Sequence, residues 1–426
     1  MSLFHNLTRF SPYVGSAIFF LTYIFIALGE NSPRKLDRPT AALLGAVLMV
    51  ISGTITKSEA MAALNIPTLS VLFGMMVLIV ALMQSGLPVQ SGYKVLTLCR
   101  NPKTLMAAVV FASGFASAIM LNDTVCLLGT PLLLEITGQA GISPVPFLFA
   151  LTTSANIGSV MTLTGNPQNI LIGHASGWSW SGFALRMTPI ALVCLVVNWG
   201  LLLIFFRKPL AAAKDHFSRR PENTGITVNH SLGIKSGYVF LGLLIALIFG
   251  APMDVSALSA AAILLVWANR PPSEILDSVD WPLLLFFAGL FVVVAGFVKA
   301  DGALLSGAAS LSGKRFTLGN TFIVSGVSLL GSNLFSNVPF VLIAGHWVKT
   351  MQNPGFSWLL LSLTSTFAGN LTLFGSVANL IVARTAQKSV SLSFLQFLKV
   401  GLPVTVVTTT VGVLLLYSLR LLGVVR

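Results

Sequence analysis

The sequence lacks most of what a soluble enzyme needs. Only 9% of its 426 residues are charged, whereas soluble domains carry about 25%. The three cysteines, Cys99, Cys126 and Cys194, lie far apart, which excludes a disulfide framework and a Cys-x-x-Cys metal motif. The sequence also has no HExxH motif and no credible catalytic triad. We therefore expect no enzymatic activity, no cofactor and no metal apart from sodium as a coupling ion.

The sequence instead contains long apolar runs without a charged residue, and 55% of its residues are hydrophobic. The runs are 12–28, 66–86, 187–206, 237–250, 281–298 and 402–419. Runs of roughly 18 or more apolar residues are typical of membrane helices. The first run is not followed by a signal-peptide cleavage pattern, so we interpret it as a span. The sequence predicts a multi-pass protein of the inner (plasma) membrane, with the lipid bilayer as its surroundings.

The formal net charge of +13 does not predict a nucleic-acid partner, because the lysines and arginines lie between the apolar runs. The longest polar stretch, 207–235, is predicted to be a basic linker between a first half, 1–206, and a second half, 236–426. Arg384 and Lys388 are predicted to anchor the end of a half-helix on the linker's side of the membrane.

The two halves show weak internal similarity. Residues 65–74 align with 280–289 at an offset of 215, and residues 162–169 (TLTGNPQN) align with 372–379 (TLFGSVAN) at an offset of 210. Four of eight residues are identical in the second pair. Polar residues that match in order at nearly constant offset indicate a structural repeat.

Each half also contains a pair of apolar arms joined by a short polar tip. The predicted arms are 104–121 and 125–136 in the first half and 318–335 and 339–349 in the second. The second arm of each pair is shorter than the roughly 20 residues that cross a bilayer, so each pair reads as a re-entrant hairpin. Each half then crosses the membrane five times, and an odd number inverts the second half.

The predicted fold is therefore all-α and membrane-integral, with about ten transmembrane helices, two re-entrant hairpins and two inverted-topology repeats with discontinuous helices. This path places sixteen of the 25 lysines and arginines on one face. The positive-inside rule then puts the linker in the cytoplasm and both termini outside.

Breaks in membrane helices mark the candidate site, because irregular backbone in a bilayer survives only where it lines a cavity or binds something. The breaks are the two hairpin tips and the interrupted helices at 165–169 and 375–379. Unwound carbonyls can bind a cation, and exposed helix N-termini suit an anion. Neutral oxygen ligands for a weakly held cation are offered by Asn122, Thr124, Asn166, Asn169, Ser336, Asn337, Ser376 and Asn379.

Asp123 is the one acid near the middle of the membrane, where a carboxylate is a functional hypothesis by default. It could bind sodium, or it could carry a proton, since burial favours its neutral form. It could also cap the second hairpin arm. Four polar residues that precede the breaks are predicted to contact substrate: Asn156, Thr162, Asn370 and Thr372.

These motifs resemble those of a known group. The segments 121–125, 154–159 and 165–169, followed by 336–339 and 369–379, are similar to signatures of the ion transporter superfamily. That group includes citrate transporter-like permeases, arsenite permeases and divalent-anion sodium symporters. The resemblance extends from about Leu36 to the final span. It implies two inverted repeats, a homodimer, and an elevator-like movement of hairpins and broken helices against a scaffold.

In the dicarboxylate branch of that group, each hairpin tip pairs with a broken helix around one sodium ion, and substrate lies between the tips. Carried over, one cation site comprises Asn122, Asp123, Thr124, Gly165 and Asn169, and the other comprises Ser336, Asn337, Gly375 and Asn379. The sequence departs from this branch at Asp123, and at Val338 where a hydroxyl is lost. An acid at the first tip fits the arsenite and proton-antiport branches better.

We expect a secondary transporter of a small anion or oxyanion, coupled to sodium or protons. A sodium/proton antiporter without an anion substrate is the alternative within transport. A channel is a further alternative, although paired breaks favour alternating access. An intramembrane enzyme, from another class, would need a nucleophile with a base or paired acids at depth.

Overall fold

The computed structural model describes residues 13–28, 36–213, 227–300 and 317–425, and every regular element in these ranges is helical. The first half contains α2 (Tyr13–Leu28), α3 (Arg38–Ile51), α4 (Lys57–Ala63), α5 (Ile66–Gln84), α6 (Leu87–Thr97), α7 (Pro102–Ile119), α8 (Asn122–Gln139), α9 (Val145–Ser159), α10 (Pro167–Ser176) and α11 (Trp180–Phe205). The second contains α12 (Arg207–Ala212), α13 (His230–Ile248), α14 (Met253–Trp267), α15 (Pro272–Leu276), α16 (Trp281–Ala300), α18 (Leu318–Phe335), α19 (Asn337–Val348), α20 (Pro354–Ala368), a 3-10 turn η3 (Leu373–Gly375), α21 (Val377–Ala386) and α22 (Phe394–Leu421).

The helices confirm the predicted all-α membrane fold. Seven described helices are long and apolar enough to cross a membrane, and α2, α3, α14, α19 and α21 are shorter apolar helices. The order of elements is the same in both halves: three apolar helices, a hairpin, a broken helix and one long final helix. The breaks fall between α9 and α10 and between α20 and α21, where the sequence predicts them.

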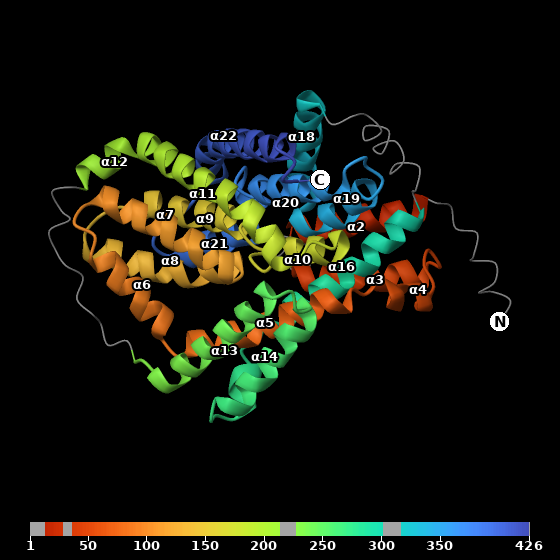
Figure 1. Cartoon of the computed structure of the whole chain (residues 1–426), viewed down its shortest axis with the longest axis horizontal. Helices are drawn as coiled ribbons and strands as arrows, with labels where there is room; N and C mark the ends of the chain where they lie inside the picture. The colour runs from red at the N-terminus through yellow and green to blue at the C-terminus, as the bar shows by residue number, and fades with distance from the viewer. Residues whose placement is uncertain (1–12, 29–35, 214–226, 301–316, 426) are drawn as a thin grey trace.

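The helices form two packed groups that each draw on both halves. In one group, which we call the scaffold, α3 packs against α16 and α5 packs against α14. In the other, which we call the tip body, α8 packs against α21 and α19 packs against α10. Figure 1 shows α14 of the scaffold, with α13 packed beside it, at one edge of the molecule, and α22 at the opposite edge.

The first hairpin differs from the prediction in the length of its second arm. Helix α8 has 18 residues rather than the expected 12 or so. Three of the additional residues, 122–124, form its first turn, where an acid such as Asp123 is favoured by the helix dipole, and three more, 137–139, extend its end. Only Met120 and Leu121 separate the arms. In the second hairpin the single residue Ser336 separates α18 from α19.

The predicted linker is partly helical. Helix α12 occupies its start, and α13 already begins at His230, before the predicted boundary at residue 235. Residues 214–226 of the linker and the N-terminal residues 1–12 lie outside the described residues. The division into two halves and the placement of both termini outside remain predictions.

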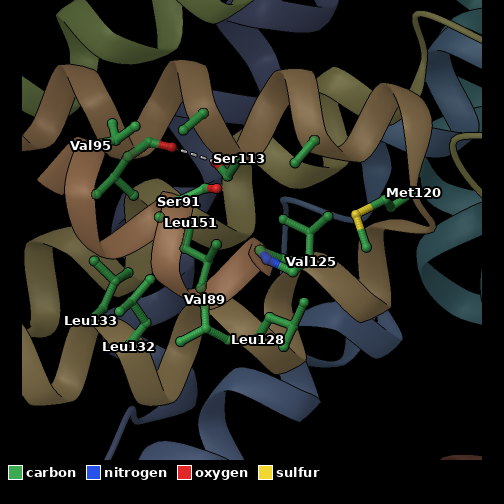
Figure 2. A pocket seen from close by; sticks show the side chains of 16 residues that line it. Val89, Ser91, Val95, Ser113, Met120, Val125, Leu128, Leu132, Leu133 and Leu151 are labelled. Atoms are coloured by element: carbon green, nitrogen blue, oxygen red, sulfur yellow. Dashed lines mark hydrogen bonds between the residues drawn. The ribbon is translucent and has the colours of Figure 1, made fainter. Parts of the chain in front are cut away.

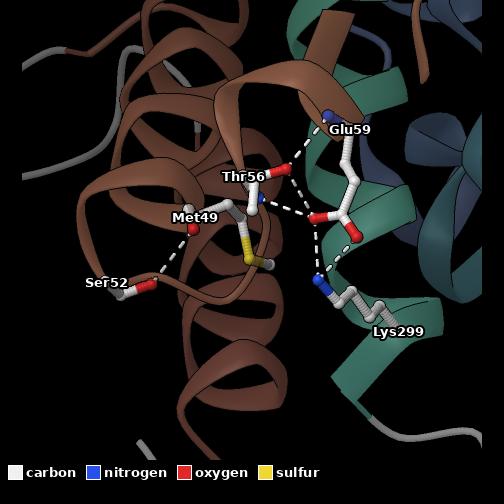
Figure 3. A network of polar contacts seen from close by, with 5 residues as sticks. All are labelled: Met49, Ser52, Thr56, Glu59 and Lys299. Carbon is white, nitrogen blue, oxygen red and sulfur yellow. Dashed lines mark hydrogen bonds and ion pairs between the residues drawn. The ribbon is translucent and has the colours of Figure 1, made fainter. Parts of the chain in front are cut away.

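An ion pair joins the first turn of α4 to the end of α16 (Figure 3). The Lys299 Nζ atom lies 2.7 Å from both carboxylate oxygens of Glu59. The same carboxylate accepts a 2.7 Å hydrogen bond from the Thr56 main-chain N–H, which completes a capping box for α4. Both charged side chains are about half exposed, so the pair is open to solvent and to screening by salt.

The Glu59 carboxylate predicts an acid-dependent contribution to stability. Its hydrogen bond from Lys299, followed by that from the Thr56 N–H, lowers its pKa from 4.5 to about 2. A lowered pKa in the folded state stabilises the protein above pH 4.5, and this stabilisation is lost as the pH falls toward about 2. We expect the Glu59→Gln protein in detergent to melt slightly below the wild type at neutral pH, and the difference to vanish over this acid range. Lys299→Gln should give the same profile, and a difference independent of pH would contradict the assignment.

Candidate functional site

The two hairpin tips and the two broken helices converge on one small cavity. It is lined by the starts of four helices, α8, α10, α19 and α21, and by one turn of α16, through Asn122, Asp123, Pro167, Gln168, Ser336, Asn337, Val338, Ser376, Val377, Leu283, Phe286 and Phe287. Four helix N-termini directed at one point make the site favourable for negative charge. Its volume of about 40 Å³ holds water or a small ion in this conformation.

Asp123 lies in this cavity on the first turn of α8. The main-chain N–H of Ala378, at the start of α21, interacts electrostatically with its carboxylate. The charges of Arg38, at the start of α3, and of Asp280, just before α16, also act on it. The acid predicted from sequence is therefore positioned where the first hairpin meets the second broken helix.

Asn122 connects the first tip to the first broken helix. Its main-chain N–H donates to the Gly165 carbonyl at 3.1 Å, and its side-chain Nδ2 donates to Asn156 Oδ1 at 3.0 Å. The remaining atom, Oδ1, is buried and has no partner within the described part of the chain. Buried polar atoms are almost always satisfied. An unpartnered oxygen in the wall of the cavity therefore points to a bound ligand, ion or water.

Both helix breaks are fastened by the same pair of hydrogen bonds. Asn169 Nδ2 donates to the carbonyls of Ser159 and Thr162, each at 3.1 Å. Asn379 Nδ2 donates to the carbonyls of Gly369 and Thr372, at 2.7 and 3.0 Å. In both halves the acceptors stand ten and seven residues before the asparagine. The two segments related by the sequence offset of 210 thus form the same hydrogen bonds between an asparagine side chain and two backbone carbonyls.

In this arrangement the two asparagines have a structural role, because they stabilise the helix breaks. Their Nδ2 groups each bond two of the carbonyls that unwinding frees, and freed carbonyls are among the groups that a cation can use. Their Oδ1 atoms also accept hydrogen bonds, from Ser362 Oγ at 2.7 Å and from Asn156 Nδ2 at 3.3 Å. Neither asparagine lines the cavity. Their predicted role as cation ligands remains a prediction, as does that of Thr124, which does not line the cavity either.

Asn156 is the centre of a buried polar network behind the tips. Its Nδ2 donates to Asn370 Oδ1 at 2.8 Å, and its Oδ1 accepts from Ser376 Oγ at 3.2 Å as well as from Asn122. Of the other predicted substrate contacts, Thr162 donates to the Ala118 carbonyl and Thr372 Oγ1 donates to Asn333 Oδ1 at 2.9 Å. None of the four predicted substrate contacts lines the cavity in this conformation, and their contact with substrate stays a prediction.

The remaining predicted residues shape the ends of the helices. Asn166 caps α10, because its Oδ1 accepts from the Asn169 N–H at 2.9 Å. Gly165 allows a close approach, because a Cβ atom there would overlap the Ser159 main chain. Ser336 adopts φ 68° and ψ 157° at the second tip, a region that costs non-glycine residues about 1–3 kcal/mol. Asn337 Oδ1 accepts from Ser332 Oγ at 2.9 Å.

Sequence reasoning missed part of the cavity wall. Gln168 belongs to a predicted break, yet only the structure shows that it lines the cavity and that its Nε2 donates to Thr366 Oγ1 at 3.2 Å. The α16 residues Leu283, Phe286 and Phe287 cover the cavity from the scaffold side. They lie in an ordinary apolar run, so no local signal distinguishes them.

A cavity larger than the one at the tips lies elsewhere and has different chemistry. It has a volume of about 330 Å³ and lies between α6, α7 and α8, with Val89, Leu128 and Leu132 in its wall (Figure 2). Its lining is almost entirely apolar and includes neither Asn122 nor Asp123. No group of three His, Cys, Asp or Glu side chains able to hold a metal occurs among the described residues.

Comparison with known proteins places this geometry among transporters. A family model described as citrate transporter matches residues 23–368. The chain is 33% identical to the silicon efflux transporter LSI3 of Oryza sativa subsp. japonica, covering 96% of this chain and 98% of the relative. It is 27% identical to a putative transporter, arsB, of Dictyostelium discoideum, with 97% and 93% covered. The solved structure of the Alcanivorax borkumensis YdaH transporter shares the fold, with a TM-score of 0.57, 14% identity, and 97% and 98% covered.

The hydrogen bonds of the breaks predict a loss of stability that differs between the two halves. Within the described part of the chain, Asn169→Ala leaves the carbonyls of Ser159 and Thr162 without a donor. Asn379→Ala leaves only the Gly369 carbonyl without one, because the Thr372 carbonyl also accepts from the Gly375 N–H at 3.0 Å. Each such carbonyl costs about 1–3 kcal/mol, so we expect both variants to melt below the wild type in detergent, and Asn169→Ala to melt lower than Asn379→Ala. Gln139→Ala, which removes an exposed amide that bonds only Glu135, is the control and should melt with the wild type. A wild-type melting temperature for either asparagine variant would show that the break does not need its side-chain donor.

Proposed function

The chain belongs to the citrate transporter family, and on this premise we propose that it is a secondary active transporter that moves a small anion or oxyacid across the inner membrane, coupled to protons through Asp123. The observation that carries the proposal is the meeting of four helix N-termini around a cavity whose one acidic side chain is Asp123. The names of the relatives, silicon efflux transporter and arsB, agree with a small oxyacid as substrate.

Coupling follows from competition between Asp123 and the anion for the start of α21. The Ala378 N–H acts on the Asp123 carboxylate, and this amide is one of those that an anion would bind there. An ionised Asp123 repels an incoming anion and competes for that amide. A protonated Asp123 does neither. Proton and anion therefore bind more tightly together than apart, which is the thermodynamic requirement for symport.

Protons suit this site better than sodium. Two carbonyls at each break already accept hydrogen bonds from Asn169 or Asn379, so a sodium ion that bound there would share these oxygens with the amide donors. Asp123 needs no such sharing to gain or lose a proton.

Alternating access is supported by the different surroundings of the two broken helices. α10 and α19 pack against α5 and α16 of the scaffold. Beside α21, in contrast, a cavity of about 180 Å³ separates the tip body from the start of α3. We propose that the packed side faces outward and that the side with the cavity faces the cytoplasm, so this conformation is inward-facing in an elevator-type cycle.

A sodium/proton antiporter is the second candidate. It is favoured by one observation: no lysine or arginine lines the tip cavity, so Asp123 could serve a cation alone. The two candidates differ in whether an anion crosses the membrane.

Flux in reconstituted vesicles tests the proposal. We expect wild-type protein to accumulate radiolabelled citrate or arsenite when a proton gradient is imposed, and the Asp123→Asn protein to fall to the level of empty vesicles, because its side chain cannot take up or release the coupling proton. Glu135→Gln, which removes an exposed acid from the same helix, should retain wild-type flux. Gradient-driven flux at the wild-type level in Asp123→Asn would sink the role of this residue. Sodium/proton exchange without flux of either probe would favour the antiporter.

A sodium titration tests the coupling ion. A ligand that binds only the folded state raises the melting temperature by mass action. If protons are the coupling ion, the melting temperature of the purified protein should not change when sodium replaces potassium at constant ionic strength. A saturable, sodium-specific rise would overturn proton coupling in favour of sodium sites at the tips.

A further inference from the structure

The apolar cavity of about 330 Å³ between α6, α7 and α8 opens at the surface of the molecule. Val95 of α6 and Ala112 of α7 line it and are exposed. Of its lining residues, only Ser91 and Ser113 have a polar side chain, and the Ser113 hydroxyl donates to the Val109 carbonyl at 2.6 Å. An apolar cavity does not hold ordered water. Inside a membrane, a hydrocarbon chain is therefore the occupant that suits it.

The cavity is long rather than compact. Its lining residues on α7 run from Val109 to Met120, a span of eleven residues that covers about 16 Å along a helix. Figure 2 shows Met120 and Val125 at one end of the cavity and Leu132 and Leu133 at the other. Met120 and Val125 flank the first hairpin tip. The cavity thus runs along the hairpin as far as its tip, which is the shape that an extended chain needs.

Basic side chains lie beyond the end of the cavity that is far from the tip. Arg100 and Lys103, which we call the basic rim, are exposed at the connection from α6 to α7. Lys103 stands six residues, or about 9 Å, before the first lining residue of α7. Arg207 and Lys208, also exposed, begin α12, which contacts α7. In the described helices α6, α7, α8 and α12, the only acid beyond the first tip is Glu135.

We propose that the cavity and the basic rim together bind one anionic phospholipid, with an acyl chain in the cavity and the phosphate at Arg100 and Lys103. The charge of the headgroup is complementary to the rim, and the apolar chain is complementary to the cavity. α12 belongs to the linker, so the rim lies on the side that is predicted to be cytoplasmic, and cytoplasmic leaflets carry anionic lipid. A headgroup at the membrane surface and a chain directed inward match the order of rim and cavity along α7.

The bound chain lies where the scaffold connects to the first hairpin. Helix α6 contacts α5 of the scaffold as well as α7 and α8 of the hairpin. The acyl chain fills the space between α6 and the hairpin and reaches Met120 and Val125 beside the tip. The lipid thus supplies packing contacts to the hairpin that no described helix supplies there.

Lipid binding to the purified full-length protein, stripped of native lipid in detergent, is the first test. The probes are dioleoyl phosphatidylglycerol and dioleoyl phosphatidylcholine, which have the same chains and differ in charge. A ligand that binds only the folded state raises the melting temperature. We expect phosphatidylglycerol to raise it in a saturable way, at a lower concentration than phosphatidylcholine. Glycerol 3-phosphate, which has the charge but no chain, should leave it unchanged.

The double variant Arg100→Gln with Lys103→Gln tests the basic rim. Its apparent affinity for phosphatidylglycerol should fall about thirtyfold, because each basic residue near anionic lipid contributes about fivefold. Its affinity for phosphatidylcholine should equal that of the wild type. Lys57→Gln with Lys349→Gln is the matched control, because it removes two exposed charges, from α4 and from the end of α19, that lie outside the cavity lining. This control should bind phosphatidylglycerol like the wild type.

Ala112→Phe tests the cavity, because the ring fills its opening from α7. Binding of phosphatidylglycerol should weaken by about tenfold or more, since burial of the chain supplies the apolar part of the affinity. Val95→Trp fills the same opening from α6, so the cavity is still tested where one of the two variants fails to fold. Ala262→Phe is the control, because Ala262 is exposed on α14 and does not line the cavity. It should bind like the wild type.

The outcomes decide the site without any measurement of transport. Weaker binding of phosphatidylglycerol in the rim and cavity variants, with both controls like the wild type, supports the lipid site. Equal affinity of the wild type for the two phospholipids overturns it, as does wild-type affinity in the cavity variants that fold. An equal loss in the Lys57 and Lys349 control would show general attraction between charges and would also overturn it. None of these results depends on the proposed anion transport.

Discussion

The structure depends on one constraint: in a bilayer every backbone N–H and carbonyl must find a partner within the protein. A continuous helix meets it automatically, whereas a broken helix does not. Asn169 and Asn379 meet it by donating to the carbonyls that each break releases, at the same spacing in both halves. The network around Asn156 then joins the first tip to both breaks. Four helix starts can therefore lie side by side in the tip body without leaving backbone groups exposed to lipid.

The same constraint determines which chemical groups in the tip cavity can still bind a ligand. Once the freed carbonyls are occupied, the tip cavity retains mainly helix N-termini, the unpartnered Asn122 oxygen and the Asp123 carboxylate. Helix starts attract anions, and a carboxylate that shares their N–H groups opposes an anion until it takes a proton. A proton-linked anion site is thus the simplest function of this arrangement. A sodium ion at the breaks would share carbonyls that already bond the asparagine amides.

Much of this architecture could be predicted from the sequence because polar residues inside apolar runs are rare and therefore informative. The tips at Asp123 and Ser336 and both helix breaks were found in this way, and the offset of 210 anticipates the shared hydrogen bonds. Three features could not be found, because each depends on contacts between distant segments. These features are the orientation of Asn156 away from the cavity, the position of α16 over the tips and the approach of Arg38 to Arg384. No local pattern in the sequence indicates any of them. The charge of Arg384 alone indicated no more than a membrane anchor.

The two repeats have similar sequences but different surroundings, and this difference carries the mechanistic argument. α10 of the first half and α19 of the second half rest against the scaffold. α21, the counterpart of α10 in the second half, borders the cavity with Arg38 and Arg384. Related sequences can adopt both environments only if neither environment is strongly preferred. This condition is met because each broken helix carries its own stabilising hydrogen bonds and needs no scaffold contact to satisfy its backbone groups. An exchange of environments between the two sides would then cost packing but no buried hydrogen bonds. On the proposed mechanism, this is why the tip body can move as a unit while the substrate stays between its tips.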